Sequence, residues 1–117
     1  MKNDEKLAIL WTNSDKETAM KMVFMYAHFS KLKGWWDKVE IIIWGSTAKL
    51  SAEDEDIQDE LVKLMTEDGI KISACITCAE SYGREVTEKL MDLGFDVKSM
   101  GPVLTEYIKS GVNILTI

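Results

Sequence analysis

Two cysteines lie three positions apart in the stretch KISACITCAESYG, residues 71–83, and they are the only cysteines in the chain. A thiolate is both a nucleophile and a metal ligand, so such a pair can bind zinc, act as a redox dithiol or carry sulfur. A buried free cysteine is also an ordinary small apolar residue, so packing is the alternative interpretation of Cys75 and of Cys78. The question of function therefore centres on these two residues.

A zinc site normally takes four protein ligands, or three ligands and a water molecule. Besides the cysteines, the chain offers a single histidine, His28, on a segment far from them in the sequence. No part of the sequence places a carboxylate beside the two thiols. We therefore predict neither a bound metal nor another cofactor.

A thioredoxin-type dithiol is a stronger alternative, because a Cys-x-x-Cys motif between a strand and a helix lowers the pKa of its first thiol. That fold, however, combines a mixed sheet with a cis-proline that faces the cysteines. Here strand and helix patterns alternate throughout, and the one proline, Pro102, follows the fourth strand pattern. This argument excludes only the thioredoxin fold, so the formation of a disulfide between Cys75 and Cys78 stays an open alternative.

The elements that position the cysteines follow from the spacing of apolar residues. Five strand-like runs occupy residues 6–12, 39–45, 69–75, 95–100 and 112–117. Helical patterns between them occupy residues 16–33, 51–69, 86–94 and 102–111. Ser51 and Asp54 form a capping-box pattern before the second helix. This alternation predicts an α/β fold with three layers, α/β/α, around a parallel sheet of about five strands in a single domain, 1–117.

Parallel sheets of this kind bind ligands at the carboxyl ends of their strands. The segments at those ends are residues 12–15, 44–49, 75–78 and 100–102, so the cysteines lie where a ligand would bind. The candidate pocket residues there are Asn13, Ser14, Gly45, Ser46, Lys49, Thr77, Gly101 and Pro102. Capping and turn formation are the ordinary alternative roles of these residues. The stretch GSTAK, residues 45–49, lacks the glycine pattern and the lysine-hydroxyl pair of a phosphate loop.

The composition excludes several classes of partner. The net charge is −6, and the 14 basic residues are scattered, so we predict binding neither to nucleic acid nor to an acidic membrane surface. No apolar run approaches the roughly 18 residues of a membrane span, and the first residues lack a signal-peptide core. We expect a cytoplasmic protein with reduced thiols.

The first helical pattern is apolar on nearly all sides, with the sequence MKMVFMYAHF at residues 20–29. A helix that covers one face of a small sheet needs a single apolar stripe. We therefore expect self-association through this helix, together with Trp35 and Trp36, to give a homo-oligomer. Coverage by neighbouring strands and the C-terminal segment is the alternative.

Several stretches of the chain resemble the DsrE/DsrF-like proteins. They are KISACITCAESYG, LMDLGFDVKSMGPVLTE, IKSGVNILTI, IIIWGSTAKLSAEDEDIQDELVKL and LAILWTNSDKETAMKM, which together cover nearly the whole sequence. The resemblance implies a parallel α/β/α domain that assembles into oligomers. It also implies a cysteine that accepts sulfane sulfur as a persulfide and passes it from a donor protein to an acceptor protein.

In the sulfurtransferase members of that family, the cysteine stands at a strand end, eight residues before the glycine that closes the next helix. Cys75 has this position relative to Gly83. The resemblance thus assigns the acceptor role to Cys75. Many relay members lack a cysteine at the position of Cys78, which leaves a resolving or redox role for this residue open. A carrier needs a thiolate, which backbone N–H groups at a helix start, the Thr77 hydroxyl and the Lys49 charge could stabilise. The alternative is a DsrE-like binding or assembly module without catalysis, whose pocket holds a small ligand.

Overall fold

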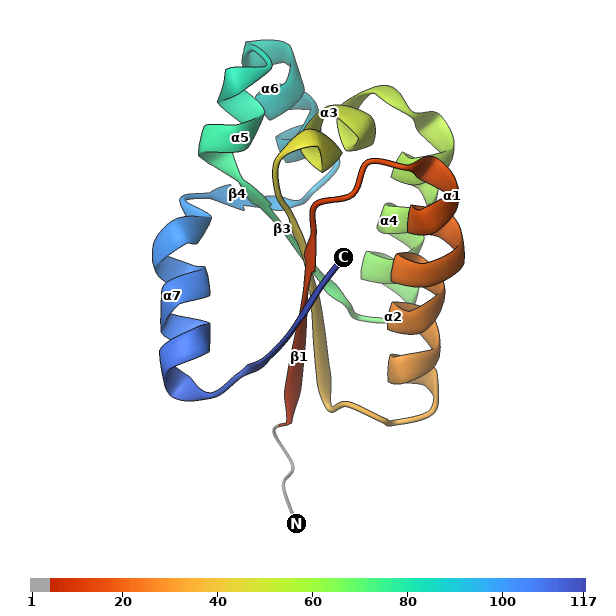
Figure 1. Ribbon diagram of the computed structural model, residues 1–117. Coiled ribbons are helices and arrows are strands. Elements are labelled where there is room, and N and C mark those ends of the chain that lie inside the picture. Colours follow the sequence, from red (N-terminus) through yellow and green to blue (C-terminus); the bar gives the residue numbers. More distant parts are fainter. Residues whose placement is uncertain (1–4) are drawn as a thin grey trace.

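The computed structural model describes residues 5–117, and its centre is a sheet of five parallel strands (Figure 1). The strands are β1 (Lys6–Trp11), β2 (Lys38–Ile43), β3 (Lys71–Cys75), β4 (Asp96–Lys98) and β5 (Asn113–Thr116). The strand order across the sheet is β4-β3-β2-β1-β5. All four neighbouring pairs are parallel, which confirms the predicted α/β fold.

Helices connect each strand to the next. They are α1 (Lys16–Thr18), η1 (Ala19–Val23), α2 (Phe24–Leu32), α3 (Ser46–Glu53), α4 (Glu55–Glu67), α5 (Ile76–Ser81), α6 (Arg84–Asp92) and α7 (Met100–Ser110). The first three form one continuous helix with a π-helical centre, as the sequence pattern over residues 16–33 predicts apart from that local widening.

The strand order explains the three layers. From β1 to β4 the chain always moves toward the same edge, and right-handed crossovers then put the connecting helices on one face of the sheet. From β4 to β5 the chain moves back across the whole sheet, so α7 lies on the opposite face. Figure 1 shows α7 alone on one side, with α1, α2 and α4 on the other.

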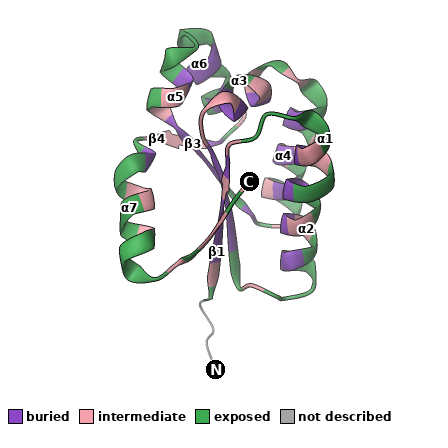
Figure 2. Ribbon diagram, viewed as in Figure 1, coloured by how far each residue is buried: buried purple, intermediate pink, exposed green. Residues whose placement is uncertain are grey.

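The larger core lies under the connecting helices. Its fully buried side chains include Ile9 and Trp11 of β1, Ile41 and Ile43 of β2, and Leu61 of α4. Trp11 meets the Phe24 ring edge-on, with 5.2 Å between the ring centroids. Figure 2 shows the buried residues concentrated on the strands and on the inner sides of these helices.

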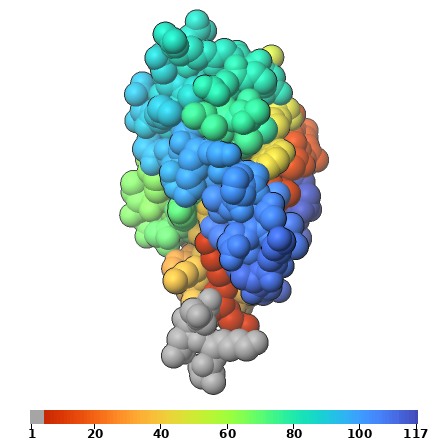
Figure 3. Space-filling view, turned by 90° about the vertical axis from the view of Figure 1, so that its left-hand side faces the viewer, coloured from red at the N-terminus to blue at the C-terminus, as the bar shows by residue number. Residues whose placement is uncertain are grey.

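The layer under α7 is thinner and partly polar. Its buried apolar residues are Ala8, Ile42, Cys75 and Met100. Figure 3, which faces this side, shows α7 lying across part of the surface. Glu40 is 1% exposed here and is held by three donors from three other elements: Lys6, Ser73 and Tyr107. This glutamate network links β1, β2, β3 and α7.

The structure departs from the sequence-based prediction after β2. Residues 44–49 were expected as a turn, but Ser46 begins α3. Ser51, predicted to cap the following helix, is buried inside α3. Asp54 is the actual N-cap of α4: its backbone is extended, and its carboxylate accepts a hydrogen bond from the Ile57 N–H at 3.0 Å. No helix within residues 5–117 combines the length and apolar character needed to cross a membrane.

Candidate functional site

The carboxyl ends of the strands meet at one edge of the sheet, because all strands are parallel. The segments that follow β1, β2 and β3 begin there, and α5 and α3 stand above this edge in Figure 1. The segments named from the sequence, residues 12–15, 44–49, 75–78 and 100–102, lie at or after the ends of β1, β2, β3 and β4.

A hydroxyl that sequence analysis missed connects the first two of these segments. Thr47 is fully buried, donates to the Trp11 carbonyl at 2.8 Å and accepts from the Trp44 N–H at 3.0 Å. Gly45 precedes it with a φ of 70°, in the left-handed region that favours glycine. The Gly-Ser-Thr order after a β-branched strand is the signal that could have indicated a threonine anchored to the preceding turn. This anchor holds the Gly45 backbone in place above the sheet.

Cys75 is the last residue of β3 and the N-cap of α5. Its side chain is 5% exposed and packs in the small core under α7, with Ala8, Ile42 and Met100. Extended backbone angles at this residue, φ −71° and ψ 114°, turn the strand directly into the helix. The thiol therefore lies at the sheet edge, in a small core that also contains the first residue of α7, Met100.

Cys78 lies one helical turn after Cys75 and packs against the same small core. Its side chain is half-buried, and both cysteines are free. Burial raises the pKa of the Cys78 thiol, and a hydrogen bond to Cys75 together with the negative charge Cys75 can carry raises it further. The backbone N–H groups of Gly45 and of Cys78 itself act in the opposite direction without reversing the shift. These surroundings favour the protonated form of Cys78 more than water does.

The other predicted site residues separate into two groups. Ser14, Ser46 and Lys49 line one open cavity of about 380 Å³, whose remaining lining residues are Leu50, Glu53 and Tyr82. Neither cysteine belongs to this lining. The Ser46 hydroxyl lies 3.4 Å from the Thr12 carbonyl, so it also has a structural partner.

Asn13, Thr77, Gly101 and Pro102 are exposed and lie outside that cavity lining. The Asn13 side-chain oxygen accepts from the Asp15 N–H at 2.9 Å, which is a turn-forming role. Gly101 and Pro102 are in the first turn of α7, next to Met100, which covers Cys75. Of the predicted residues, only Gly45 contributes a backbone group to a cysteine.

The conserved protein of unknown function BT1422 from Bacteroides thetaiotaomicron is 44% identical to this chain, with a TM-score of 0.91 over 100% of this chain and 98% of that chain. The chain belongs to the BT1422 family.

The YchN protein from E. coli shares the fold of the BT1422 family at much lower identity. It is 14% identical, with a TM-score of 0.66 over 97% of this chain and 99% of YchN. The likeness shows a DsrE-like fold, in agreement with the sequence resemblance, and shows the fold alone. No family model matches the chain, and no curated protein matches it.

The single histidine lies far from the cysteines in this member of the BT1422 family. Among residues 5–117, no group of three or more His, Cys, Asp or Glu side chains is placed to hold a metal ion. The His28 ring nitrogen Nδ1 instead lies 2.6 Å from an Asp68 carboxylate oxygen, on the helical layer opposite α7. His28 thus has a partner in a helix-to-helix contact between α2 and the end of α4.

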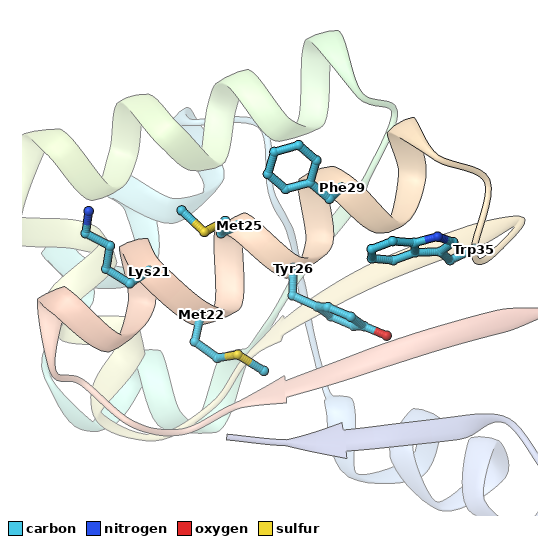
Figure 4. A pocket seen from close by; sticks show the side chains of 6 residues that line it. All are labelled: Lys21, Met22, Met25, Tyr26, Phe29 and Trp35. Carbon is cyan, nitrogen blue, oxygen red and sulfur yellow. The ribbon is translucent and has the colours of Figure 1, made fainter.

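The outward side of η1 and α2 carries an apolar surface, which we call the α2 face: Met22, Met25, Phe29, Leu32 and Trp35. Their exposed fractions range from 38% to 65%. A shallow depression of about 260 Å³ lies among four of them together with Tyr26 and Lys21 (Figure 4). The apolar character that the sequence predicts on all sides of this helix therefore reaches the molecular surface.

Proposed function

We propose that this protein is a sulfur carrier that accepts sulfane sulfur as a persulfide on Cys75. The observation that carries the proposal is the pair of neighbouring thiols at the end of β3 in a DsrE-like fold. Cys75 stands where the sequence resemblance puts the sulfur-accepting cysteine. Cys78 supports that role because it can donate a hydrogen bond to an anionic sulfur on Cys75.

The transfer step needs a thiolate and no cofactor. The Cys75 sulfur attacks the outer sulfur of a donor persulfide, a new S–S bond forms, and the donor thiolate leaves with the electrons of the broken S–S bond. The proton that Cys75 gives up passes to this departing thiolate. A second protein thiol then takes the outer sulfur from Cys75 in the same way, which makes the activity a sulfur transfer with donor and acceptor proteins as partners.

Burial of Cys75 sets a condition on this chemistry. At 5% exposure, the thiol accepts sulfur either from a donor whose persulfide is narrow enough to pass Cys78, or after the first turn of α7 moves aside. A carrier gains from this cover, because a buried persulfide is protected from thiols other than its intended acceptor.

The test is sulfur loading of the reduced protein with glutathione persulfide, followed by alkylation and intact mass measurement. The Cys78→Ser variant, in which Cys75 is the remaining thiol, should gain one sulfur, and the Cys75→Ser variant should gain none. Sulfur gain by Cys75→Ser, or its absence in both wild type and Cys78→Ser, would show that Cys75 is not the acceptor. Thermal unfolding of each variant controls for loss of the fold.

A binding module without catalysis is the second candidate, and the cavity between Ser14, Ser46, Lys49 and Tyr82 supports it. Hydroxyl groups and one lysine in an open cavity of about 380 Å³ suit a small polar ligand. Thermal-shift screening of wild type would identify such a ligand, and the Lys49→Gln variant should no longer bind it. Loss of binding in this variant, together with no sulfur loading of wild type, would favour this function over the carrier.

We also infer that the α2 face joins two copies of this chain. With about 200 Å² for a complete side chain, its five residues expose on the order of 500 Å². This area lies within the roughly 300–600 Å² of the largest apolar patch on a typical monomer, which is often functional, and it could form the apolar centre of an interface of about 800 Å² per partner. Lys21 is the one charged residue that lines its depression, so two identical faces meet with little repulsion. Two free cysteines suit a reducing compartment, and we place the oligomer in the cytoplasm.

Light scattering tests the self-association. Wild type should be larger than a monomer, and Met25→Glu, which puts a charge in the centre of the α2 face, should shift it to monomer without lowering its thermal stability. The exposed Met91 on α6 lies outside this face, so Met91→Glu is the matched control and should leave the size unchanged. A monomeric wild type at high concentration would refute the interface.

A further inference from the structure

The two cysteines differ in surroundings although they share one core. Cys75 is buried in the same small core as Met100, whereas Cys78 is half-buried and lies against both that core and the Gly45 backbone. They are also the only thiols in the chain, so sulfur bound to Cys75 has Cys78 as its one intramolecular partner. A simple carrier, by contrast, needs one thiol.

The backbone at this junction permits a bond between the two sulfurs. Cys75 is the N-cap of α5 and Cys78 is its third residue, so the two lie on the same side of the first turn. A disulfide needs Cβ atoms about 3.5–4.5 Å apart, which is closer than the separation of about 5–6 Å between residues three apart within a helix. Because Cys75 is the extended N-cap and Cys78 belongs to the first turn of α5, closing the bond requires that turn to move toward Cys75 by about 1–2 Å, while β3 keeps its place in the sheet.

We propose that Cys78 is a resolving thiol, which attacks a persulfide on Cys75 to form a Cys75–Cys78 disulfide and release hydrosulfide. The inference rests on the proposed function, because the persulfide is its substrate. It adds an activity: the protein would reduce sulfane sulfur to sulfide as well as carry it.

The step balances in atoms and electrons. The Cys78 sulfur bonds to the inner sulfur, the one attached to Cys75, and the bond between inner and outer sulfur breaks. The outer sulfur leaves with that electron pair and with the Cys78 proton, as hydrosulfide. The two cysteines are oxidised from dithiol to disulfide while the sulfane sulfur is reduced, and an external dithiol must reduce the disulfide before the next cycle.

The arrangement favours this outcome over escape of the persulfide to another protein. The cover that α7 places over Cys75 hinders large acceptor thiols, whereas Cys78 lies inside that cover and touches the same core.

The experiment treats the reduced full-length protein with glutathione persulfide and measures two products. Wild type should release nearly one hydrosulfide per chain and lose the mass of two hydrogens, with both cysteines then protected from alkylation until a reductant is added. Cys78→Ser should release no hydrosulfide and instead keep one added sulfur on Cys75. Peptide mapping without reductant should locate the disulfide between residues 75 and 78.

The remaining outcomes separate the two proposals. If wild type keeps the added sulfur, releases no hydrosulfide and matches Cys78→Ser, the resolving role is wrong and the carrier stands. If Cys78→Ser also releases hydrosulfide and retains the glutathione portion of the donor, Cys75 has attacked the inner sulfur of the donor, no persulfide forms on Cys75, and both proposals are wrong. If neither protein reacts, both proposals are wrong. A Cys78→Ala variant with unchanged thermal stability confirms that the loss of hydrosulfide reflects chemistry and not unfolding.

Discussion

The glutamate network under α7 gives the sharpest test of how this fold is held together. Replacement of Glu40 by glutamine keeps the size of the side chain and removes its charge. The Glu40 carboxylate lies 2.9 Å from Lys6 Nζ and accepts hydrogen bonds from Tyr107 at 2.6 Å and from Ser73. In the variant, the ion pair is lost and the two hydroxyl donors face a neutral amide.

The expected cost follows from these contacts. A hydrogen bond to a charged group is worth about 1.5–3 kcal/mol and a neutral one about 1 kcal/mol, so weakening two of them costs roughly 1–4 kcal/mol. Lys6 is 23% exposed, so its ammonium group can turn toward water in the variant. Loss of the ion pair therefore adds less to the cost in unfolding free energy than the several kcal/mol expected for a fully buried pair. We expect Glu40→Gln to lower the free energy of unfolding by about 2–3 kcal/mol at neutral pH.

The pH dependence of this loss is a second readout. Burial opposes ionisation of Glu40, but the hydrogen bonds from Ser73, Tyr107 and Lys6 and the charge of Lys6 outweigh it, and the pKa lies below its ordinary value of 4.5. The stabilisation is therefore complete above pH 4.5 and disappears as pH falls through the lower pKa of the folded state. The difference between wild type and Glu40→Gln should shrink over the same interval.

Urea unfolding followed by tryptophan fluorescence measures both quantities at fixed protein concentration. Asp56→Asn is the matched control, because Asp56 pairs with Lys16 at 2.8 Å but is 71% exposed, and its change should stay below about 0.5 kcal/mol. A cost for Glu40→Gln as small as that of the control, or a cost that does not change with pH, would refute the reasoning.

Two further predictions concern the segments around α3. Asp54→Ala should lower the free energy of unfolding by about 1 kcal/mol, because it removes the cap of α4, whereas Ser51→Ala inside α3 should cost less, as measured by urea unfolding. Equal costs would mean that Asp54 does not act as the cap. Thr47→Val should cost about 1–3 kcal/mol, since it leaves the Trp11 carbonyl without its side-chain donor and removes an acceptor from the Trp44 N–H. Thr66→Val, which removes an exposed hydroxyl on α4, is the control in thermal unfolding and should change stability by less than about 0.5 kcal/mol; a similar loss in both variants would contradict the anchoring role of Thr47.

The strands and the parallel sheet could be predicted because their apolar runs are local and nearly unbroken, as in VEIIIWG at residues 39–45. The helix α3 was missed because Gly45, Ser46 and Thr47 are turn-forming types, and their helical conformation depends on the bond from Thr47 back to β1. The Gly-Ser-Thr order hints at an anchored threonine, but a local pattern cannot identify its partner 36 residues away in the chain.

The same limit applies to the candidate site. The location of Cys75 at a strand end follows from alternation of strands and helices, and the structure places it there. Its cover by Met100 does not follow, because it depends on the return of the chain across the sheet between β4 and β5. Lys6 and Tyr107 meet at Glu40 for the same reason, although 101 residues separate them.

The return of the chain across the sheet also determines how local unfolding affects the thiols. The segment from α7 to β5 is held by β1 along one edge and by the thin core under α7, so it buries little area and should open at a lower free energy than the main core. Each opening removes Met100 from above Cys75. The rate of amide hydrogen exchange in β5 and the rate of alkylation of Cys75 should therefore report the same opening equilibrium. The reactivity of this cysteine is then a measure of the local stability of the last 18 residues, 100–117.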